Sequence, residues 1–344
     1  MTGPSPGPDH SSALSVPTAD CLSACSREAL VGRARLYALI RKFFEERSVL
    51  EVETPLLSQR TVTDPLLRVF ESRYQPAGQS IDQTLYLQTS PEFAMKRLLA
   101  SGLGSIFQIS KAFRNGEVGR HHNPEFTLLE WYRVGFDLDA LQTEIEHLLM
   151  HLAQAFERQV TVERTTYCEI FERYLGLHPL DAPMDALRFR AEEGGFHDAQ
   201  ALCGRNRGHW LDFLFSCLIQ PNLSPGCLTM VRRYPAVLPS LARKAEDDPR
   251  WVERVELFLG GMELGNGFHE LIDPVEQEAR FLSDLEVRKG EGLYAPELDD
   301  RLLDALRLGI PDCSGIAIGL DRLLMVLTGM SRIEEVLSFP FQRA

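Results

Sequence analysis

The chain has 344 residues, which is enough for one large domain or two ordinary ones with a substantial buried core. Its 36 lysines and arginines against 49 aspartates and glutamates give a formal net charge of −13, so no overall positive field attracts nucleic acid and any RNA contact has to be local. The seven cysteines are odd in number, scattered and without paired spacing, which indicates neither a disulfide framework nor a zinc site.

The first 26 residues differ in composition from the rest. They contain four prolines among glycines and serines, which predicts a disordered tail with order beginning near Arg27. This segment lacks the basic start and apolar centre of a signal peptide, and no run of about 18 apolar residues follows that would span a membrane. We therefore expect a cytoplasmic protein that makes no membrane contact.

A long amphipathic helix is the first predicted element. Apolar residues recur at helical spacing from Glu28 to Arg47. A short strand follows from Val49 and is halted by Pro55. A helix followed by such a strand suits a core edge or a dimer interface.

Residues 84–89 predict a further strand, which leads into a helix from Phe93 to Ala100. Ser90 is suited to capping that helix, Pro91 to its first position and Glu92 to its positive end. Helix-start chemistry alone explains these three residues, and the pattern by itself assigns them no other function.

The most informative segment predicts a hairpin, with strands from Ser105 to Phe113 and from Pro124 to Arg133 around a charged loop. Strand alternation directs four side chains toward one pocket: Arg114, Phe126, Glu130 and Tyr132. A guanidinium fits a phosphate, and an aromatic ring beside it offers a purine a stacking surface. We interpret the hairpin as built around an anion; the alternative is a surface hairpin with scattered charges.

A helix is predicted from Asp137 to Arg158, with further helical segments between residues 165 and 220. None of these contains a pattern that indicates catalysis or binding.

In the next hairpin signal, Gly260 and Gly261 form the turn, and strand pairing puts Glu256 on the same face as Glu263. A bound Mg²⁺ would make this carboxylate pair favourable, and a plain solvated face is the alternative.

Two polar residues farther along this strand, Asn266 and Glu270, lie an odd number of positions from Glu263. They face the same pocket only if the strand contains a bulge, which Gly265 and Gly267 allow. We therefore expect an irregularity in this strand if the polar residues act together.

The last pattern is a short buried strand that passes through Gly319 into a helix. It puts Arg322 in the first helical turn, beside backbone donors suited to phosphate. A packing glycine followed by an exposed arginine is the alternative interpretation.

The order of these pieces resembles the catalytic core of class II aminoacyl-tRNA synthetases, with the three motifs near residues 30–57, 107–133 and 311–329. Segments 113–115, 122–126, 129–132 and 262–271 resemble the lysine-specific branch. Lysyl-tRNA synthetases carry an anticodon-binding domain ahead of this core, whereas only about 26 tail residues precede it here. Such a shortened core resembles the ligases that attach (R)-β-lysine to elongation factor P.

The resemblance implies an α+β catalytic domain over residues 27–344, with a mixed, mainly antiparallel sheet flanked by helices, and a homodimer. It implies that Arg114 contacts the α-phosphate of ATP, and that Phe126 and Arg322 sandwich adenine, with Arg322 also reaching the triphosphate. The remaining nucleotide-binding positions are Asn115, Gly116, Asn123, Glu263, Leu264 and Gly319. Glu256 and Glu263 match Mg²⁺ ligands. The amino-acid pocket corresponds to Ser90, Pro91, Glu92, Glu130, Tyr132, Asn266, Phe268 and Glu270.

Two residues depart from the class II pattern. Gly116 stands where the hairpin usually has a glutamate and Glu117 follows, which leaves open whether Glu117 or a backbone group contacts adenine. Ala317 stands where lysyl-tRNA synthetases have glycine. One methyl group in a tight pocket contributes roughly 1–3 kcal/mol of discrimination, which favours β-lysine over α-lysine in our interpretation.

The implied function is an ATP-dependent ligase that activates β-lysine or lysine as an adenylate and transfers it to a lysine side chain of elongation factor P. The alternatives are an enzyme that charges tRNA and a small-molecule amide ligase, both with the same adenylate chemistry. The missing anticodon module and the net charge argue against tRNA. A silent paralogue that only binds regulators is a third class, against which Arg114, Glu256, Glu263 and Arg322 argue because they are intact.

Overall fold

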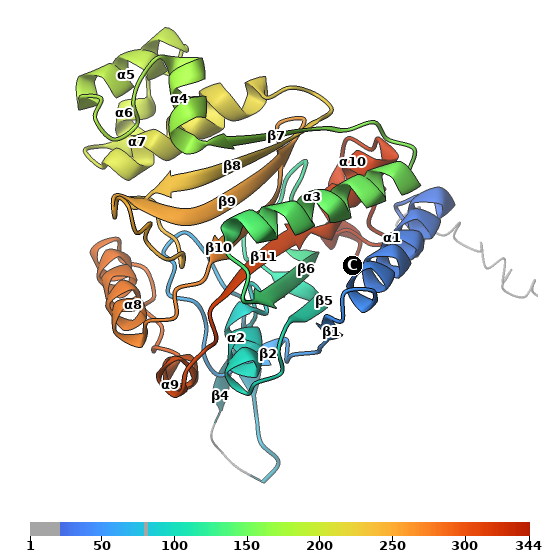
Figure 1. Ribbon diagram of the computed structural model, residues 1–344. Coiled ribbons are helices and arrows are strands. Elements are labelled where there is room, and N and C mark those ends of the chain that lie inside the picture. Colours follow the sequence, from blue (N-terminus) through green and yellow to red (C-terminus); the bar gives the residue numbers. More distant parts are fainter. Residues whose placement is uncertain (1–20, 79–81) are drawn as a thin grey trace, which may run out of the picture.

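A computed structural model describes residues 21–78 and 82–344, so most of the predicted tail lies outside the described residues. Its centre is an eight-stranded sheet in the order β1-β5-β6-β11-β10-β9-β8-β7 (Figure 1). Only the outer pairs β1/β5 and β7/β8 are parallel. The strands are β1 (Leu50–Glu51), β5 (Ile106–Phe113), β6 (Glu125–Val134), β7 (Thr161–Thr166), β8 (Cys227–Pro235), β9 (Trp251–Leu259), β10 (Met262–His269) and β11 (Cys313–Gly319).

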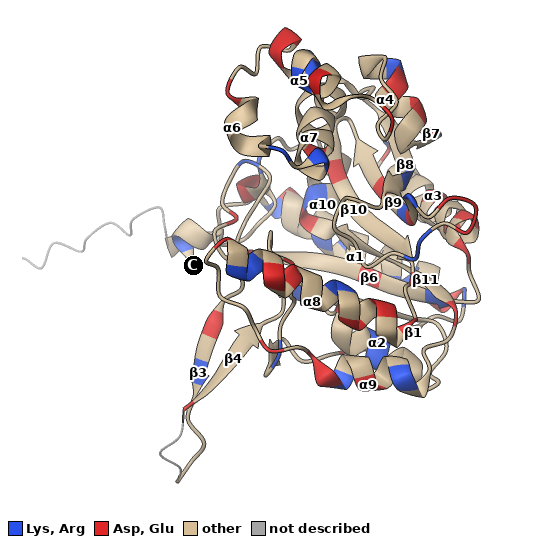
Figure 2. Ribbon diagram, turned by 90° about the vertical axis from the view of Figure 1, so that its left-hand side faces the viewer, with Lys and Arg blue, Asp and Glu red and all other residues tan. Residues whose placement is uncertain are grey.

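A second sheet of three short strands, in the order β2-β4-β3, extends away from the large one (Figures 1 and 2). Its strands are β2 (Leu57–Ser58), β3 (Glu71–Tyr74) and β4 (Gln83–Leu87). Charged residues of both signs are distributed over the helices and strands of the molecule (Figure 2). The predicted α+β class with a mixed, mainly antiparallel sheet flanked by helices is confirmed.

One face of the large sheet is closed by three helices. Phe107, Leu129, Trp131 and Ile316 point from neighbouring strands into one apolar core. The helices that cover this core are α1 (Arg27–Glu45), α3 (Leu138–Ala155) and α10 (Leu320–Thr328). Since successive strand residues face opposite sides, the residues between these apolar positions must lie on the other face.

On that other face, the helices of the described residues pack at the two ends of the sheet. At one end, a core around Ile106, Tyr132 and Cys313 packs against α2 (Glu92–Ala100), α8 (Pro274–Gly290) and α9 (Asp300–Leu308). At the other end, a core around Val231 and Phe258 packs against α4 (Tyr167–Leu175), α5 (Met184–Glu193), α6 (Ala199–Cys203), α7 (Arg207–Leu214) and the π-helical turn Phe215–Ile219. The middle of the face between these two helical groups is where the polar side chains gather.

The strand register aligns those polar residues in one row. Glu130 pairs with Gln108 on one side and with Ala317 on the other. Asn266 pairs with Ala317 and with Glu256. One continuous line of paired residues therefore crosses five strands and carries both an acidic pocket and a possible metal ligand.

Most predicted elements are present, with three differences. The strand predicted after Val49 is reduced to the two residues of β1, because only these pair with β5. Pro91 is the residue before α2 rather than its first member, although the Ser90 hydroxyl still accepts the backbone N–H of Glu92, at 3.1 Å. Within the predicted tail, the Ala24 backbone N–H donates to the Ser338 carbonyl at 2.8 Å.

In the described part of the chain, every helix is too short or too polar to cross a membrane.

Candidate active site

The two arginines singled out from the sequence line the same cavity. Arg114 follows β5 and Arg322 lies in the first turn of α10, after the β11 strand that Gly319 ends. The two converge because β6 lies between β5 and β11 in the sheet. The cavity is lined by Arg114, Glu117, His121, His122, Asn123, Phe126, Leu128, Glu263, Leu264, Gly265, Asn266, Ala317, Gly319, Asp321, Arg322 and Ile333.

Arg322 is held in place by backbone groups. Its Nε donates to the His121 carbonyl at 3.1 Å and its Nη1 to the Glu263 carbonyl at 2.9 Å. Its Nη2 lies 2.6 Å from Nε2 of His122, and burial, followed by the neighbouring Arg322 charge, lowers the pKa of His122. His122 is therefore favoured as a neutral ring that accepts from the guanidinium.

Arg114 is oriented by an aromatic ring. Its guanidinium carbon lies 5.1 Å from the centre of the Phe126 ring, within the range of a cation–π contact. Its Nη1 lies 3.8 Å from the Glu117 carboxylate. Its Nε is buried and has no hydrogen-bond partner within the described residues. The guanidinium thus has donor capacity to spare, which suits an incoming anion.

Three nucleotide-binding candidates shape the loop between β5 and β6. Gly116 has φ +85°, a left-handed conformation that glycine adopts without strain. The Asn115 backbone N–H donates to the Arg68 carbonyl at 2.9 Å. Asn123 donates through Nδ2 to the Glu125 carbonyl at 2.6 Å and accepts the Phe341 N–H at 3.0 Å. Asn123 lines the cavity and also joins the loop to the C-terminal segment.

The predicted bulge in β10 is present. Pairing with β9 shifts between Glu263 and Gly265, so Leu264 is the extra residue. The shift puts Glu263 on the same face as Asn266 and Glu256. Without the bulge, Glu263 would face the apolar core on the far side of the sheet.

Glu256 and Glu263 differ in their partners. Glu256 is paired with Arg254 and accepts the Tyr234 hydroxyl at 2.6 Å. The Glu263 carboxylate lies 3.8 Å from Arg322 Nη1. Partial burial and the nearby Glu256 charge raise the pKa of Glu263, against the pull of Arg322. Such repulsion between neighbouring carboxylates is what a divalent cation relieves, and both offer the oxygen ligands that Mg²⁺ prefers.

A buried acidic pocket lies beside the cavity, on the same row of paired strand residues. Glu130 is 2% exposed. Its two carboxylate oxygens accept the Ser90 hydroxyl at 2.7 Å and the Tyr132 hydroxyl at 2.6 Å. Burial, and then the charge of nearby Glu92, raise the pKa of Glu130 to about 8. The pocket therefore contains a carboxyl group that becomes charged near neutral pH.

Lys96, which was not among the residues predicted from the sequence, lies in the same pocket. Its Nζ lies 2.7 Å from Oε1 of Glu92 and 2.7 Å from Oε2 of Glu270, and the residue is 2% exposed. Burial disfavours the ammonium, but the Glu270 and Glu92 carboxylates outweigh it and raise the pKa of Lys96. Burial raises the pKa of Glu270 to about 7 although Lys96 lowers it. The spacing of Glu92 and Lys96 along one helix was the available signal, and it is common to many surface ion pairs.

The remaining pocket candidates frame this acidic centre. Asn266 accepts from Arg254 Nε at 3.2 Å, and Phe268 pairs with Gly315 in the neighbouring strand. A Cβ atom built on Gly315 would lie 2.4 Å from the Tyr132 ring and 2.8 Å from Glu270 Oε1. Position 315 therefore has no room for a side chain, because the ring and the carboxylate occupy that space.

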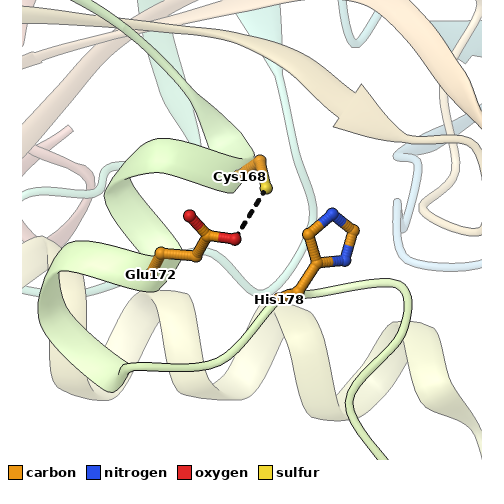
Figure 3. A group of neighbouring side chains, drawn as sticks. All are labelled: Cys168, Glu172 and His178. Carbon is orange, nitrogen blue, oxygen red and sulfur yellow. Dashed lines mark hydrogen bonds between the residues drawn. The ribbon is translucent and has the colours of Figure 1, made fainter.

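A group of metal-type ligands outside this row lies at α4 and the turn after it (Figure 3). The Cys168 thiol donates to Glu172 at 3.6 Å, and burial raises the pKa of that thiol to about 11. Nδ1 of His178 lies 3.1 Å from the Asp181 carboxylate. One hydrogen bond thus joins two members of the group, and the third, His178, is paired with Asp181 outside it.

Comparison with known proteins gives a match to one family over nearly the whole chain. The model of the class II tRNA synthetases (D, K and N) matches residues 10–343, which include every site residue described above. An elongation factor P (R)-β-lysine ligase of Vibrio cholerae is 45% identical over 325 residues, 94% of this chain and 99% of that protein. The protein of the same name in Salmonella paratyphi B is 43% identical over 327 residues, 95% of this chain and 99% of that protein.

Proposed function

The chain belongs to the class II tRNA synthetase family, whose similar members named above are ligases, and we propose that it activates (R)-β-lysine with ATP and transfers it to a lysine side chain of elongation factor P. The observation that carries the proposal is the position of Arg114 and Arg322 in one cavity, adjoining a buried pocket with three carboxylates. Two guanidiniums suit a triphosphate, and buried carboxylates suit the ammonium groups of a lysine-type amino acid.

The first chemical step needs no nucleophile from the protein. The substrate carboxylate attacks the α-phosphorus of ATP, the bond to the β-phosphate oxygen breaks, and pyrophosphate leaves with that electron pair. Arg114, whose buried Nε has no hydrogen-bond partner among residues 21–78 and 82–344, would hold the phosphate, and Phe126 and Arg322 would hold adenine between them. Catalysis is then positioning together with neutralisation of the developing charge.

In the second step, a neutral lysine amine of the acceptor attacks the acyl carbonyl of the adenylate, AMP leaves, and the amine proton passes to solvent. Glu256 and Glu263 would hold Mg²⁺, which supplies charge neutralisation at the phosphates. Their carboxylates fit this role because they share one face of the β9–β10 hairpin and repel one another without a cation. Asn115, Gly116, Asn123, Leu264 and Gly319 would complete the nucleotide site.

Protein rather than tRNA is the proposed acceptor. The name of the relatives, which this chain matches over 94–95% of its length, supports elongation factor P. The net charge of −13 opposes binding of a polyanion. We further propose one catalytic domain over residues 27–344 behind a tail of 26 residues, a cytoplasmic location and a homodimer. Exposed Leu30 and Val31 on α1 and Leu50 on β1 support pairing through this edge.

The adenylate step is tested by amino-acid-dependent exchange of labelled pyrophosphate into ATP. We expect Arg114→Ala to lower the exchange rate at least 1000-fold, because removing a charge-stabilising donor typically costs 10²–10³-fold and Arg114 also positions the phosphate. Arg97→Ala, at an exposed position on α2, is the matched control and should keep the wild-type rate. Near-normal exchange by Arg114→Ala would contradict the assignment.

The acceptor is tested separately. The enzyme is incubated with ATP, either lysine isomer, and either elongation factor P or tRNA, and each product is weighed by mass spectrometry. A mass gain on elongation factor P with β-lysine supports the proposal. A gain on tRNA alone would favour a charging enzyme, and adenylate formation without either gain would favour a small-molecule ligase.

A further inference from the structure

Lys96 is the one buried cation of the acidic pocket within the described residues, and neither the family match nor the proposed mechanism gives it a role. Its ammonium forms ion pairs with two carboxylates at once, Glu92 of its own helix and Glu270, which directly follows β10. Burying an ammonium group costs free energy unless its charge is paired, so the burial of Lys96 depends on its two carboxylate partners.

The third carboxylate has a different environment. Glu130 is bonded by two hydroxyl groups, and no ion pair within the described residues includes it. The titratable and charged groups around it are Glu92 and Lys96 of α2, Tyr132 of its own strand and Glu270 directly after β10, with Arg243 and Cys313 farther out beside Glu270. The pocket therefore contains three carboxylates and one ammonium, and that ammonium contacts only two of the carboxylates.

This arrangement gives the pocket a formal charge of −2 when all three carboxylates are ionised. A lysine-type amino acid has two ammonium groups, so its charges match the deficit left by Lys96. If Lys96 were absent, three carboxylates would face two ammonium groups, and each would compete for the same partners.

We propose that Lys96 is a positioning residue for the amino-acid pocket: its ammonium holds Glu92 and Glu270 in ion pairs and leaves Glu130 as the carboxylate without a cation until substrate binds. The inference rests on the proposed function and extends it to a residue outside the set matched from the family. Glu270 and Glu130 differ in their electrostatic surroundings, which supports the inference. Both are buried, but Lys96 lowers the pKa of Glu270, whereas Glu92 and Glu270 both raise that of Glu130.

The wild-type enzyme provides a first test, by calorimetric titration with (R)-β-lysine at pH 7.5 in buffers of different ionisation enthalpy. Burial raises the pKa values of Glu130 and Glu270, so these carboxyl groups hold protons near neutral pH that binding of ammonium groups should release. Proton release on binding supports the proposal. Binding without any proton release would overturn it.

The second test substitutes the residue. Lys96→Met keeps the length of the side chain but removes its charge, and Arg97→Met on the exposed side of α2 is the control. We expect Lys96→Met to raise the KM for the amino acid at least tenfold at pH 7.5, to leave the KM for ATP within twofold, and to release more protons on binding than the wild type does, because Lys96 lowers the pKa of Glu270. The KM difference from wild type should narrow at pH 9, where the freed carboxylates ionise.

An unchanged KM for the amino acid in a folded Lys96→Met variant would overturn the proposal while leaving the ligase function intact. If the variant does not fold, the proton count of the wild-type enzyme decides. Absence of amino-acid-dependent pyrophosphate exchange in the wild type would instead count against the proposed function, and against this inference with it.

Discussion

Glu130 makes the stability of the unliganded protein depend on pH in a direction that can be measured. Its pKa rises from the ordinary 4.5 to about 8 in the folded protein, chiefly because the carboxyl group is buried. The folded state therefore keeps a proton that the unfolded chain loses above pH 4.5. The stabilisation from this proton is complete below pH 4.5 and is lost as the pH rises through about 8.

The size of the effect follows from the shift. Each pKa unit corresponds to about 1.4 kcal/mol, so the full loss is about 5 kcal/mol, of which about 4 kcal/mol falls between pH 5 and pH 8.5. Glu130→Gln resembles the protonated side chain and does not ionise. We expect the variant to match the wild type at pH 5, to within about 1 kcal/mol, and to exceed its free energy of unfolding by up to about 4 kcal/mol at pH 8.5.

The assay is urea unfolding at pH 5, 7 and 8.5, at one fixed protein concentration because an oligomer's stability depends on it. Glu246→Gln, at an exposed position, is the control and should show no such trend with pH. The reasoning is refuted if the difference between Glu130→Gln and wild type stays constant with pH, or if it shrinks as the pH rises. The same variant should bind the amino acid weakly, since it cannot supply the charge.

Three further predictions concern the row of paired strand residues and the metal. Ala317→Gly removes a methyl group from the lining of the cavity, next to Glu130 in the pairing, so we expect the ratio of kcat/KM for β-lysine over α-lysine to fall roughly tenfold; an unchanged ratio would remove Ala317 from the specificity argument. Glu256→Gln should raise the Mg²⁺ concentration needed for half-maximal pyrophosphate exchange about tenfold, while Glu253→Gln on the same strand should not; equal Mg²⁺ requirements would exclude Glu256 as a ligand. Gly315→Ala should lower the free energy of unfolding by roughly 1–3 kcal/mol, because its Cβ would overlap the Tyr132 ring. In thermal unfolding the control Gly290→Ala, whose Cβ meets open space, should be neutral, and equal stability of the two variants would show that the overlap is relieved at no cost.

The hairpins were the part of the fold that the sequence predicted best, because their signals are local. Gly260 and Gly261 both adopt positive φ, and Leu259 and Met262 pair across them as expected. The bulge in β10 was also predicted correctly. Glu263 and Asn266 face the same side although their spacing is odd, which requires one extra residue between them, and Leu264 is that residue. Local backbone chemistry and strand alternation determine these features without any knowledge of the rest of the chain.

The strand order and the edges were beyond such reasoning. Only two residues of the predicted strand after Val49 pair with β5, because pairing at an edge depends on which neighbour lies alongside. Nothing in the sequence pattern placed β11 between β6 and β10, and this order is what brings Arg322 to the cavity that Arg114 lines. Their convergence was anticipated only through the family resemblance.

Lys96 shows the corresponding difficulty for a functional site. In the sequence it is a basic residue four positions after Glu92 on an amphipathic helix, which is the ordinary pattern of a solvated ion pair. Its burial follows from the packing of α2 against the sheet residue Ile106 and against α9, which is distant from Glu92 in sequence. Electrostatic partners across a sheet are set by tertiary packing, so they cannot be found from spacing along a helix.

The position of the acidic pocket explains how one sheet can serve two opposite charges. The row that runs through Glu130, Ala317 and Asn266 ends at Glu256, and the guanidiniums lie beyond it, at the ends of β5 and β11. Charge therefore changes sign along the strands over a few residues, from carboxylates in the middle of the face to arginines at the strand ends. An amino acid whose ammonium groups enter the acidic part must direct its carboxylate toward the arginines, and this is the orientation that attack on a phosphorus atom held there requires. Under the proposed function, we expect a neutral side chain at position 130 to remove that orientation even with both arginines in place, because the acidic pocket and the cavity of Arg114 and Arg322 would then have to act together.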